Sequence, residues 1–118
     1  MKALVLSYAG CSTCAKALKW LRERDVTVEL RPIVDEPPTA VELAAWIPKS
    51  ARPVRKWLNT SGLSYRALDR ERVAAAKDDE IVKWLTKDGK LVKRPVVVAG
   101  KHVLVGFDEQ AYAAAFAG

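Results

Sequence analysis

The chain has 118 residues, half of them hydrophobic, and carries a formal net charge of +6. This length is typical of one domain, and the apolar content is enough to build a core without disulfide staples. The sequence has no stretch long and apolar enough to span a bilayer, and the apolar run after Met1 is too short for a secretion signal. These features predict a single soluble domain over residues 1–118, located in the cytoplasm.

The N-terminal part of the chain alternates between strand and helix patterns. Residues 3–8 are short and apolar, as expected of a buried strand, and residues 12–24 repeat apolar positions at helical spacing. Residues 26–30 alternate apolar and polar side chains, which indicates a half-buried strand. We expect this strand to end near Arg31, because Pro32 lacks the N–H group that a central strand needs.

The middle of the chain is predicted to be helical. Thr39 is followed three residues later by Glu42, which is the pattern of a capping box at the start of a helix that continues through Trp46. The remaining helical patterns cover residues 53–58, 69–76 and 78–85.

The C-terminal part predicts a β-hairpin and a last helix. Residues 96–99 and 102–105 form two short strands around Gly100, and Asp108 caps a helix that reaches Phe116. The resulting order of elements is typical of a thioredoxin-like α/β fold, in which helices flank a mixed four-stranded sheet. In this interpretation the helical segment, about 37–90, is an insertion between the second and third strands.

Two cysteines lie at the predicted start of the first helix, in the run Gly10-Cys11-Ser12-Thr13-Cys14. Free N–H groups and the helix dipole stabilise a thiolate there, so Cys11 is predicted to be the nucleophile and Cys14 the resolving thiol. The motif has two alternative interpretations. A structural zinc site needs four ligands, whereas the chain offers two cysteines and His102, so no metal is expected. An inert buried pair of cysteines is the other alternative.

Arg94 precedes Pro95 at the start of the third predicted strand. The proline by itself is compatible with a purely structural position at the first residue of a strand. In a thioredoxin-like fold, however, this loop lies opposite the dithiol turn, and an arginine there offers a planar fork that suits an oxyanion. We therefore predict that Arg94 faces Cys11.

Basic side chains are concentrated between Lys49 and Arg72, where seven basic residues stand against two acidic ones. Such an excess suits an anionic partner, although a solvated helical face explains most of these side chains equally well. The four tryptophans fall on amphipathic helix faces and are interpreted as core residues. No motif interleaves aromatic and basic residues in the manner of a nucleic-acid surface, so direct nucleic-acid binding is not expected.

Several motifs together resemble the glutaredoxin-linked arsenate reductase family, which also contains the Spx and MgsR transcription regulators. The resemblance covers nearly the whole chain, in the same order. It is carried by Cys11-Ser12-Thr13-Cys14-Ala15-Lys16-Ala17-Leu18, Glu36-Pro37-Pro38-Thr39, Asn59-Thr60-Ser61-Gly62, Lys93-Arg94-Pro95-Val96-Val97-Val98 and Val105-Gly106-Phe107.

The resemblance implies a cis peptide bond before Pro95 and a Cys11 that attacks arsenate. It also implies that Arg94 and Pro95, with the N–H groups of Ser12 and Thr13, form the oxyanion site. Reduction would then use glutathione with glutaredoxin, or Cys14 followed by thioredoxin, and no bound cofactor.

The sequence also departs from the reductases. These use two further arginines, and the matching stretches here carry Trp57 to Asn59 and Phe107. The candidates for additional anion contacts are Asn59 and the basic residues Arg52, Arg55, Lys56 and Arg66. The second cysteine places the chain nearer the branch with the Spx regulators, so the alternative function is a redox switch that binds the RNA polymerase α subunit.

Overall fold

The computed structural model describes residues 1–117. It divides the chain into two compact units. One is formed by Met1–Pro32 together with the C-terminal segment from Arg94, and the other by Ile33–Lys93. The predicted insertion at about 37–90 falls inside the second unit.

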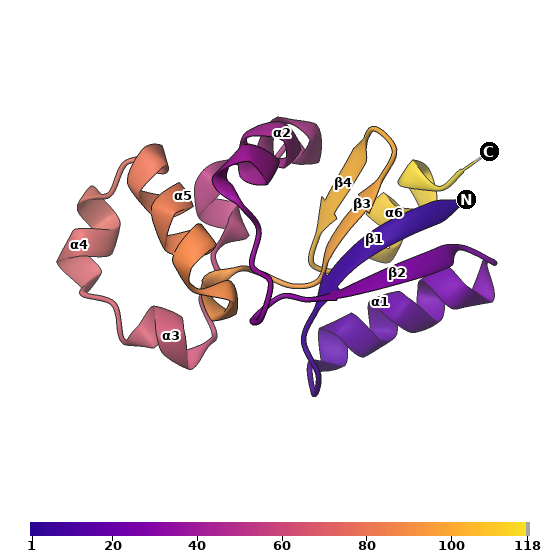
Figure 1. The fold of residues 1–118 in the computed structure, drawn as a ribbon, viewed down its shortest axis with the longest axis horizontal. Helices are drawn as coiled ribbons and strands as arrows, with labels where there is room; N and C mark the ends of the chain where they lie inside the picture. The colour runs from indigo at the N-terminus through magenta and orange to yellow at the C-terminus, as the bar shows by residue number, and fades with distance from the viewer. Residues whose placement is uncertain (118) are drawn as a thin grey trace. The chain divides into compact units, whose positions relative to one another are not determined.

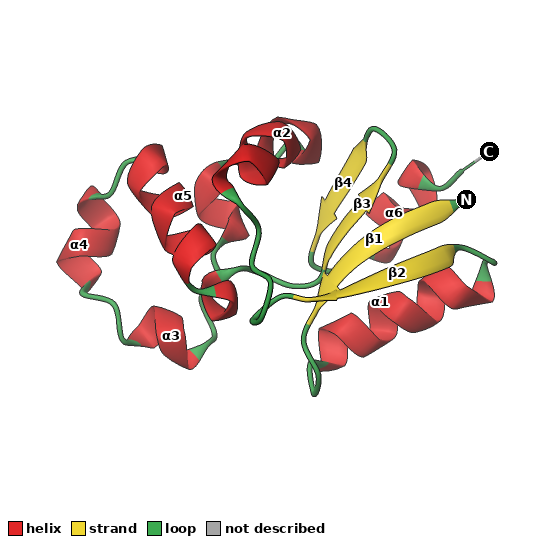
Figure 2. Ribbon diagram, viewed as in Figure 1, coloured by secondary structure: helices red, strands yellow, loops and turns green. Residues whose placement is uncertain are grey.

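The first unit is built on a four-stranded mixed sheet (Figures 1 and 2). The strands, in spatial order, are β2 (Thr27–Pro32), β1 (Lys2–Ser7), β3 (Val96–Ala99) and β4 (His102–Val105). β1 pairs in parallel with β2 and antiparallel with β3, which pairs antiparallel with β4. This arrangement, with helices flanking the sheet, confirms the predicted thioredoxin-like fold class.

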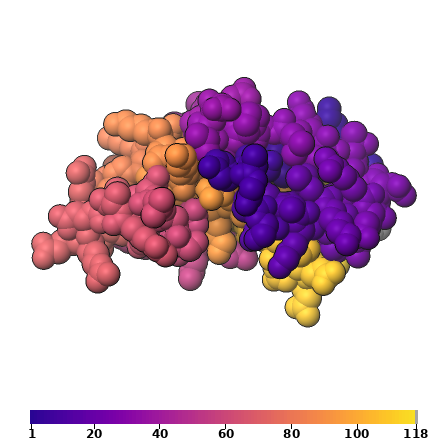
Figure 3. All heavy atoms as spheres, turned by 90° about the horizontal axis from the view of Figure 1, so that it is seen from below, coloured from indigo at the N-terminus to yellow at the C-terminus, as the bar shows by residue number. Residues whose placement is uncertain are grey.

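Two helices, α1 (Ser12–Glu23) and α6 (Glu109–Ala115), pack on one another beside this sheet. The rings of Trp20 and Tyr112 meet edge to face with centroids 5.6 Å apart, and atoms of α6 adjoin those of α1 in Figure 3. Both side chains belong to a core that includes Val5 of β1 and Val97 of β3. Burial of these apolar side chains is what holds the two helices to the sheet.

One strand boundary was predicted wrongly. β2 continues through Pro32, whereas we expected it to end near Arg31. The reason is that β2 is the edge strand and pairs only with β1 in the sheet, so the missing N–H of Pro32 removes no ladder bond on a second side.

The second unit is helical. The capping box is present: the Thr39 N–H donates to Glu42 Oε1 at 2.9 Å and the Glu42 N–H donates to Thr39 Oγ1 at 3.1 Å. The elements are α2 (Ala40–Ser50), the 3-10 turn η1 (Val54–Trp57), α3 (Leu63–Arg66), α4 (Arg70–Ala75), α5 (Asp78–Lys87) and the 3-10 turn η2 (Gly89–Leu91).

The helical unit also corrects the sequence prediction in detail. α2 runs to Ser50 and not only through Trp46, with Pro48 in its last turn, and α3 was not predicted. Trp46 and Trp57 are buried core residues, as is Trp20 in the first unit, while Trp84 is half-buried. Within residues 1–117, no helix has the length and apolar character that crossing a membrane requires.

Candidate functional site

The dithiol lies where β1 turns into α1. Gly10 adopts φ +83°, a conformation that L side chains rarely adopt, and the Cys11 N–H donates to the Tyr8 carbonyl oxygen at 3.2 Å. This turn makes Cys11 the N-cap residue of α1, and its Sγ accepts the Cys14 N–H at 3.3 Å. A cysteine sulfur thus occupies the place where an oxygen of Ser, Thr or Asp usually caps a helix.

The surroundings of Cys11 favour the thiolate form of its side chain. Partial burial by itself raises its pKa, but hydrogen bonds from the Cys14 thiol and backbone N–H, and then from the positively charged Arg94, outweigh it. The pKa of Cys11 therefore lies below its ordinary value. Its side chain remains partly exposed, so a reactant can reach the sulfur.

Cys14 has the opposite character. It is 2% exposed, and burial together with the hydrogen bond from its thiol to Cys11 raises the pKa of Cys14 to about 12. Its thiol therefore stays protonated near neutral pH. Burial, and the neighbouring Cys14, also raise the pKa of Tyr112, whose hydroxyl donates to the Gly106 carbonyl oxygen at 2.6 Å.

Arg94 completes this cluster. It stands at the peptide bond before Pro95, which is cis as the family resemblance implied. The guanidinium is close enough to Cys11 to lower its pKa, and its Cζ atom lies 4.5 Å from the centroid of the Tyr8 ring. Its Nη1 atom is buried and has no hydrogen-bond partner among the described residues. A buried donor without an acceptor is costly, so this group is suited to an anion that binds beside Cys11.

The other predicted anion contacts divide between the two units. Ser12 and Thr13 are the exposed first residues of α1, where N–H groups have no intrahelical acceptor. Pro95 is buried, and its carbonyl oxygen accepts the Gly106 N–H at 2.8 Å. The first unit therefore brings these three residues to the same end of the sheet as Cys11.

Asn59 and Arg52 belong to the second unit. The Asn59 side chain is occupied there, because its Nδ2 donates to the Lys90 carbonyl oxygen at 3.4 Å and its Oδ1 accepts from Ser61 at 3.1 Å. The Arg52 backbone N–H donates to Ser50 Oγ at 3.2 Å. These contacts assign both residues a place in the fold of the helical unit.

The family resemblance matches the two further arginines of the reductases to the stretch Trp57 to Asn59 and to Phe107, and both aromatic side chains there are packing residues. Trp57 is fully buried and donates from Nε1 to Ser50 Oγ at 3.2 Å. Phe107 stacks edge to face on Tyr112, with ring centroids 4.9 Å apart. Each aromatic side chain contributes to the core of its own unit, so neither supplies an anion contact.

Sequence reasoning missed Tyr8. It sits three residues before Cys11, and nothing in that spacing indicates that its ring lies beside Arg94, which is distant in the chain. The only available signal was a large aromatic residue at the end of a buried strand. Among residues 1–117, no three His, Cys, Asp or Glu side chains are grouped so that they could hold a metal ion.

Comparison with known proteins agrees with this geometry. The ArsC family model matches residues 6–115. The uncharacterized protein YusI of Bacillus subtilis is 40% identical over 106 residues, covering 89% of this chain and 90% of YusI. The global transcriptional regulator Spx of Streptococcus mutans is 27% identical over 109 residues, covering 92% of this chain and 78% of Spx.

Solved structures share the fold. An ArsC family related protein from Bacteroides fragilis superposes with a TM-score of 0.91 at 46% identity and covers 97% of each chain. Arsenate reductase from Vibrio cholerae superposes with a TM-score of 0.78 at 18% identity, over 89% of each chain, which is a likeness of fold alone. With a family model that matches nearly its whole length, this chain belongs to the ArsC family.

Proposed function

We propose that the protein is a thiol-dependent oxidoreductase that reduces arsenate, or a similar tetrahedral oxyanion, at Cys11. The observation that carries this proposal is the buried Nη1 of Arg94, which has no partner among residues 1–117 and stands beside a cysteine of lowered pKa. A nucleophile and an oxyanion-binding cation are thus side by side. Membership of the ArsC family supports the same activity.

The first step is attack of the Cys11 thiolate on arsenic. An S–As bond forms, and an arsenate oxygen leaves as water after it takes up a proton. Arg94 pairs with the remaining oxygens through charge-assisted hydrogen bonds, and the N–H groups of Ser12 and Thr13 at the helix start add to them. Arsenic is still As(V) at this stage.

The second step resolves the adduct. The sulfur of Cys14 attacks the sulfur of Cys11, the S–As bond breaks, and its electron pair passes to arsenic, which leaves as arsenite. The two thiols are oxidised to a Cys11–Cys14 disulfide while As(V) is reduced to As(III), so electrons balance. The proton of the Cys14 thiol is lost as the S–S bond forms. Until that moment the raised pKa of Cys14 keeps it from competing with Cys11 for substrate.

The disulfide must then be reduced by an outside thiol. We propose that thioredoxin does this in the cytoplasm, or that glutathione with glutaredoxin acts directly on the Cys11 adduct and replaces Cys14 as resolving thiol. The two routes differ in their need for Cys14. Substitution of that residue therefore separates them.

The test is an NADPH-coupled assay of arsenate-dependent turnover, run once with thioredoxin and its reductase and once with glutathione, glutaredoxin and glutathione reductase. Cys11→Ser should abolish turnover with both donors. Cys14→Ser should abolish it with thioredoxin only, if glutathione can resolve the adduct. Arg94→Gln should raise KM for arsenate about tenfold or more, since it removes a charge-assisted contact. Arg22→Gln, on the exposed face of α1, is the matched control.

Absence of turnover with either donor system would refute the proposal, provided that the wild-type protein is folded and its two thiols are free. Turnover that persists in Cys11→Ser would refute the assigned nucleophile.

A second candidate function is a redox-sensing regulator that binds the RNA polymerase α subunit. It is favoured by the likeness to Spx and to regulatory protein MgsR of Bacillus subtilis, which is 24% identical over 102 residues. In this role the Cys11–Cys14 dithiol is the sensor. A pull-down with the C-terminal domain of the α subunit, on oxidised and reduced protein, should show binding that depends on the redox state. Absence of binding in both states excludes this function.

A further inference from the structure

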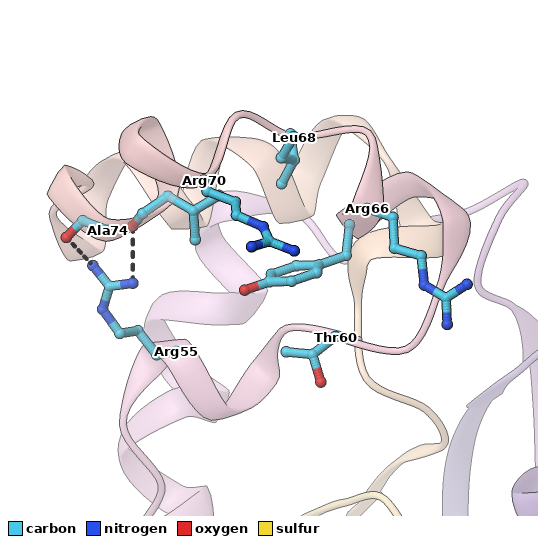
Figure 4. Close-up of a pocket in the computed structure, with 8 residues that line it drawn as sticks. Arg55, Thr60, Arg66, Leu68, Arg70 and Ala74 are labelled. Atoms are coloured by element: carbon cyan, nitrogen blue, oxygen red, sulfur yellow. Dashed lines mark hydrogen bonds between the residues drawn. The ribbon is translucent and has the colours of Figure 1, made fainter.

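The helical unit contains a cavity of about 560 Å³ whose lining includes neither Cys11 nor Cys14 (Figure 4). Its walls come from η1, from the loop that follows it, and from α3 and α4. The volume lies inside the range of about 300–1,000 Å³ that is usual for small-molecule sites. No role in the thiol chemistry uses this cavity.

Arg55 holds one side of the cavity in place. Its guanidinium donates to the carbonyl oxygens of Val73 at 3.0 Å, Ala74 at 3.3 Å and Ala76 at 2.7 Å, at the C-terminal end of α4. Two of these bonds are drawn in Figure 4. A charged group shared among three carbonyls joins α4 to η1 firmly. Arg55 is therefore a structural clamp, and its charge is already compensated.

The other polar groups of the cavity have no such partners. The guanidinium groups of Arg66 and Arg70 and the hydroxyls of Thr60 and Tyr65 make no hydrogen bond or ion pair with any residue from 1 to 117. Figure 4 shows the Arg70 head group within the space between α4 and Thr60, whereas the Arg66 head group and the Thr60 hydroxyl point away from it. Asp69, which precedes Arg70 in the sequence, caps α4, where it accepts the Glu71 N–H.

The cavity also has an apolar side. Leu68 is half-buried and Val73 is buried, and both line the same space as the two arginines. An unpaired guanidinium group next to an apolar surface matches a ligand that has an anionic head and an apolar body. The local surplus of basic residues between Lys49 and Arg72 favours the same sign of ligand.

From these contacts we propose that the cavity is a second anion site, which binds a small organic phosphate or carboxylate. Arg70 pairs with the anionic group, the hydroxyl of Tyr65 hydrogen-bonds to it, and Leu68 and Val73 contact the apolar body. This site is independent of Cys11 and Arg94. Anion binding in this cavity does not depend on the proposed reaction at Cys11.

The experiment is a titration of ¹⁵N-labelled full-length protein, carrying Cys11→Ser, with phenyl phosphate and separately with benzoate, followed by amide chemical shifts. Saturable shifts are expected in residues 60–74, and phenol, which lacks the anionic group, should give none. The two probes distinguish a phosphate site from a carboxylate site. Arg70→Gln should weaken binding about tenfold, as expected for loss of one charge-assisted contact.

The matched control is Arg72→Gln. Arg72 lies on α4 like Arg70, and its substitution removes the same charge. The Nε atom of Arg72, however, is paired with Glu80 at 3.3 Å, and Arg72 does not line the cavity. The Arg72→Gln variant should bind phenyl phosphate and benzoate with the affinity of the parent protein. The proposal is overturned if neither probe gives saturable shifts in residues 60–74, if the shifts are confined to residues 11–14 and 94, or if Arg72→Gln weakens binding as much as Arg70→Gln.

Discussion

The guanidinium carbon of Arg94 lies 4.5 Å from the centroid of the Tyr8 ring, so the cation that faces Cys11 rests against an aromatic surface. Tyr8 also accepts the Cys11 N–H through its backbone carbonyl. A single residue therefore contacts both the turn that presents the nucleophile and the arginine beside it. This arrangement makes Tyr8 a positioning residue for Arg94.

Replacement of Tyr8 by Leu should loosen Arg94, because it removes the ring but leaves the backbone contact in place. A cation–π contact at a partly exposed site is worth about 0.5–1 kcal/mol, so we expect KM for the oxyanion to rise about two- to fivefold with little change in kcat. Tyr8→Phe keeps the ring and should behave like the parent. Equal effects of the two substitutions would show that the hydroxyl, and not the ring, matters.

Iodoacetamide should modify Cys11 selectively near neutral pH. The thiolate is the reactive form of a cysteine. Because the pKa of Cys11 is lowered, Cys11 should react at pH values below the ordinary pKa of a cysteine thiol, and its reactivity should be lost as the pH falls through the lowered pKa. Cys14, with a pKa of about 12, should stay unmodified. Peptide mass spectrometry across a pH series measures both sites.

Arg94→Gln should move the Cys11 alkylation profile to higher pH, because it removes a nearby positive charge and a hydrogen bond that lower the pKa of Cys11. Lys101→Gln, in the exposed β3–β4 turn, removes the same charge and should leave the profile unchanged. Identical profiles for the parent and Arg94→Gln would contradict the role of Arg94 in thiolate stabilisation.

Arg55→Met should destabilise the helical unit. The change leaves three carbonyl oxygens at the end of α4 without the guanidinium, and we expect a loss of about 1–3 kcal/mol in the free energy of unfolding. Amide hydrogen exchange in α4 should quicken. Arg66→Met removes an exposed guanidinium that makes no hydrogen bond or ion pair with residues 1–117, and it should change stability little. If both variants lose the same stability, Arg55 is not a clamp.

Gly89→Ala should be strongly destabilising. A Cβ atom at this position would overlap the carbonyl oxygen of Ile33, which is backbone and cannot swing away. We expect a loss of at least about 2–3 kcal/mol, measured by urea denaturation. At Gly62 a Cβ would meet only the end of the Asn59 side chain, 2.7 Å away, so Gly62→Ala is the control with a small effect. A mild effect at Gly89 would contradict this close approach.

Local patterns accounted for much of the fold. The capping box at Thr39 and the strand and helix pattern around the dithiol rest on hydrogen bonds and burial within a few residues, and the structure has them. The prediction of where β2 ends was wrong because that boundary depends on contacts that are not local. Whether Pro32 is tolerated depends on which strands flank β2, and strand order is not a property of the strand itself.

By itself, the sequence determined the class of fold and the placement of Cys11 at a helix start, because periodicity and capping are local. Tertiary structure alone decided what surrounds that cysteine. Burial raises the pKa of Cys14, whereas hydrogen bonds from Cys14 and Arg94 lower the pKa of Cys11. Packing places the Tyr8 ring beside Arg94 and leaves Nη1 of Arg94 without a partner in the described chain. Such contacts join residues far apart in sequence, and they exist only once the sheet and its helices have packed.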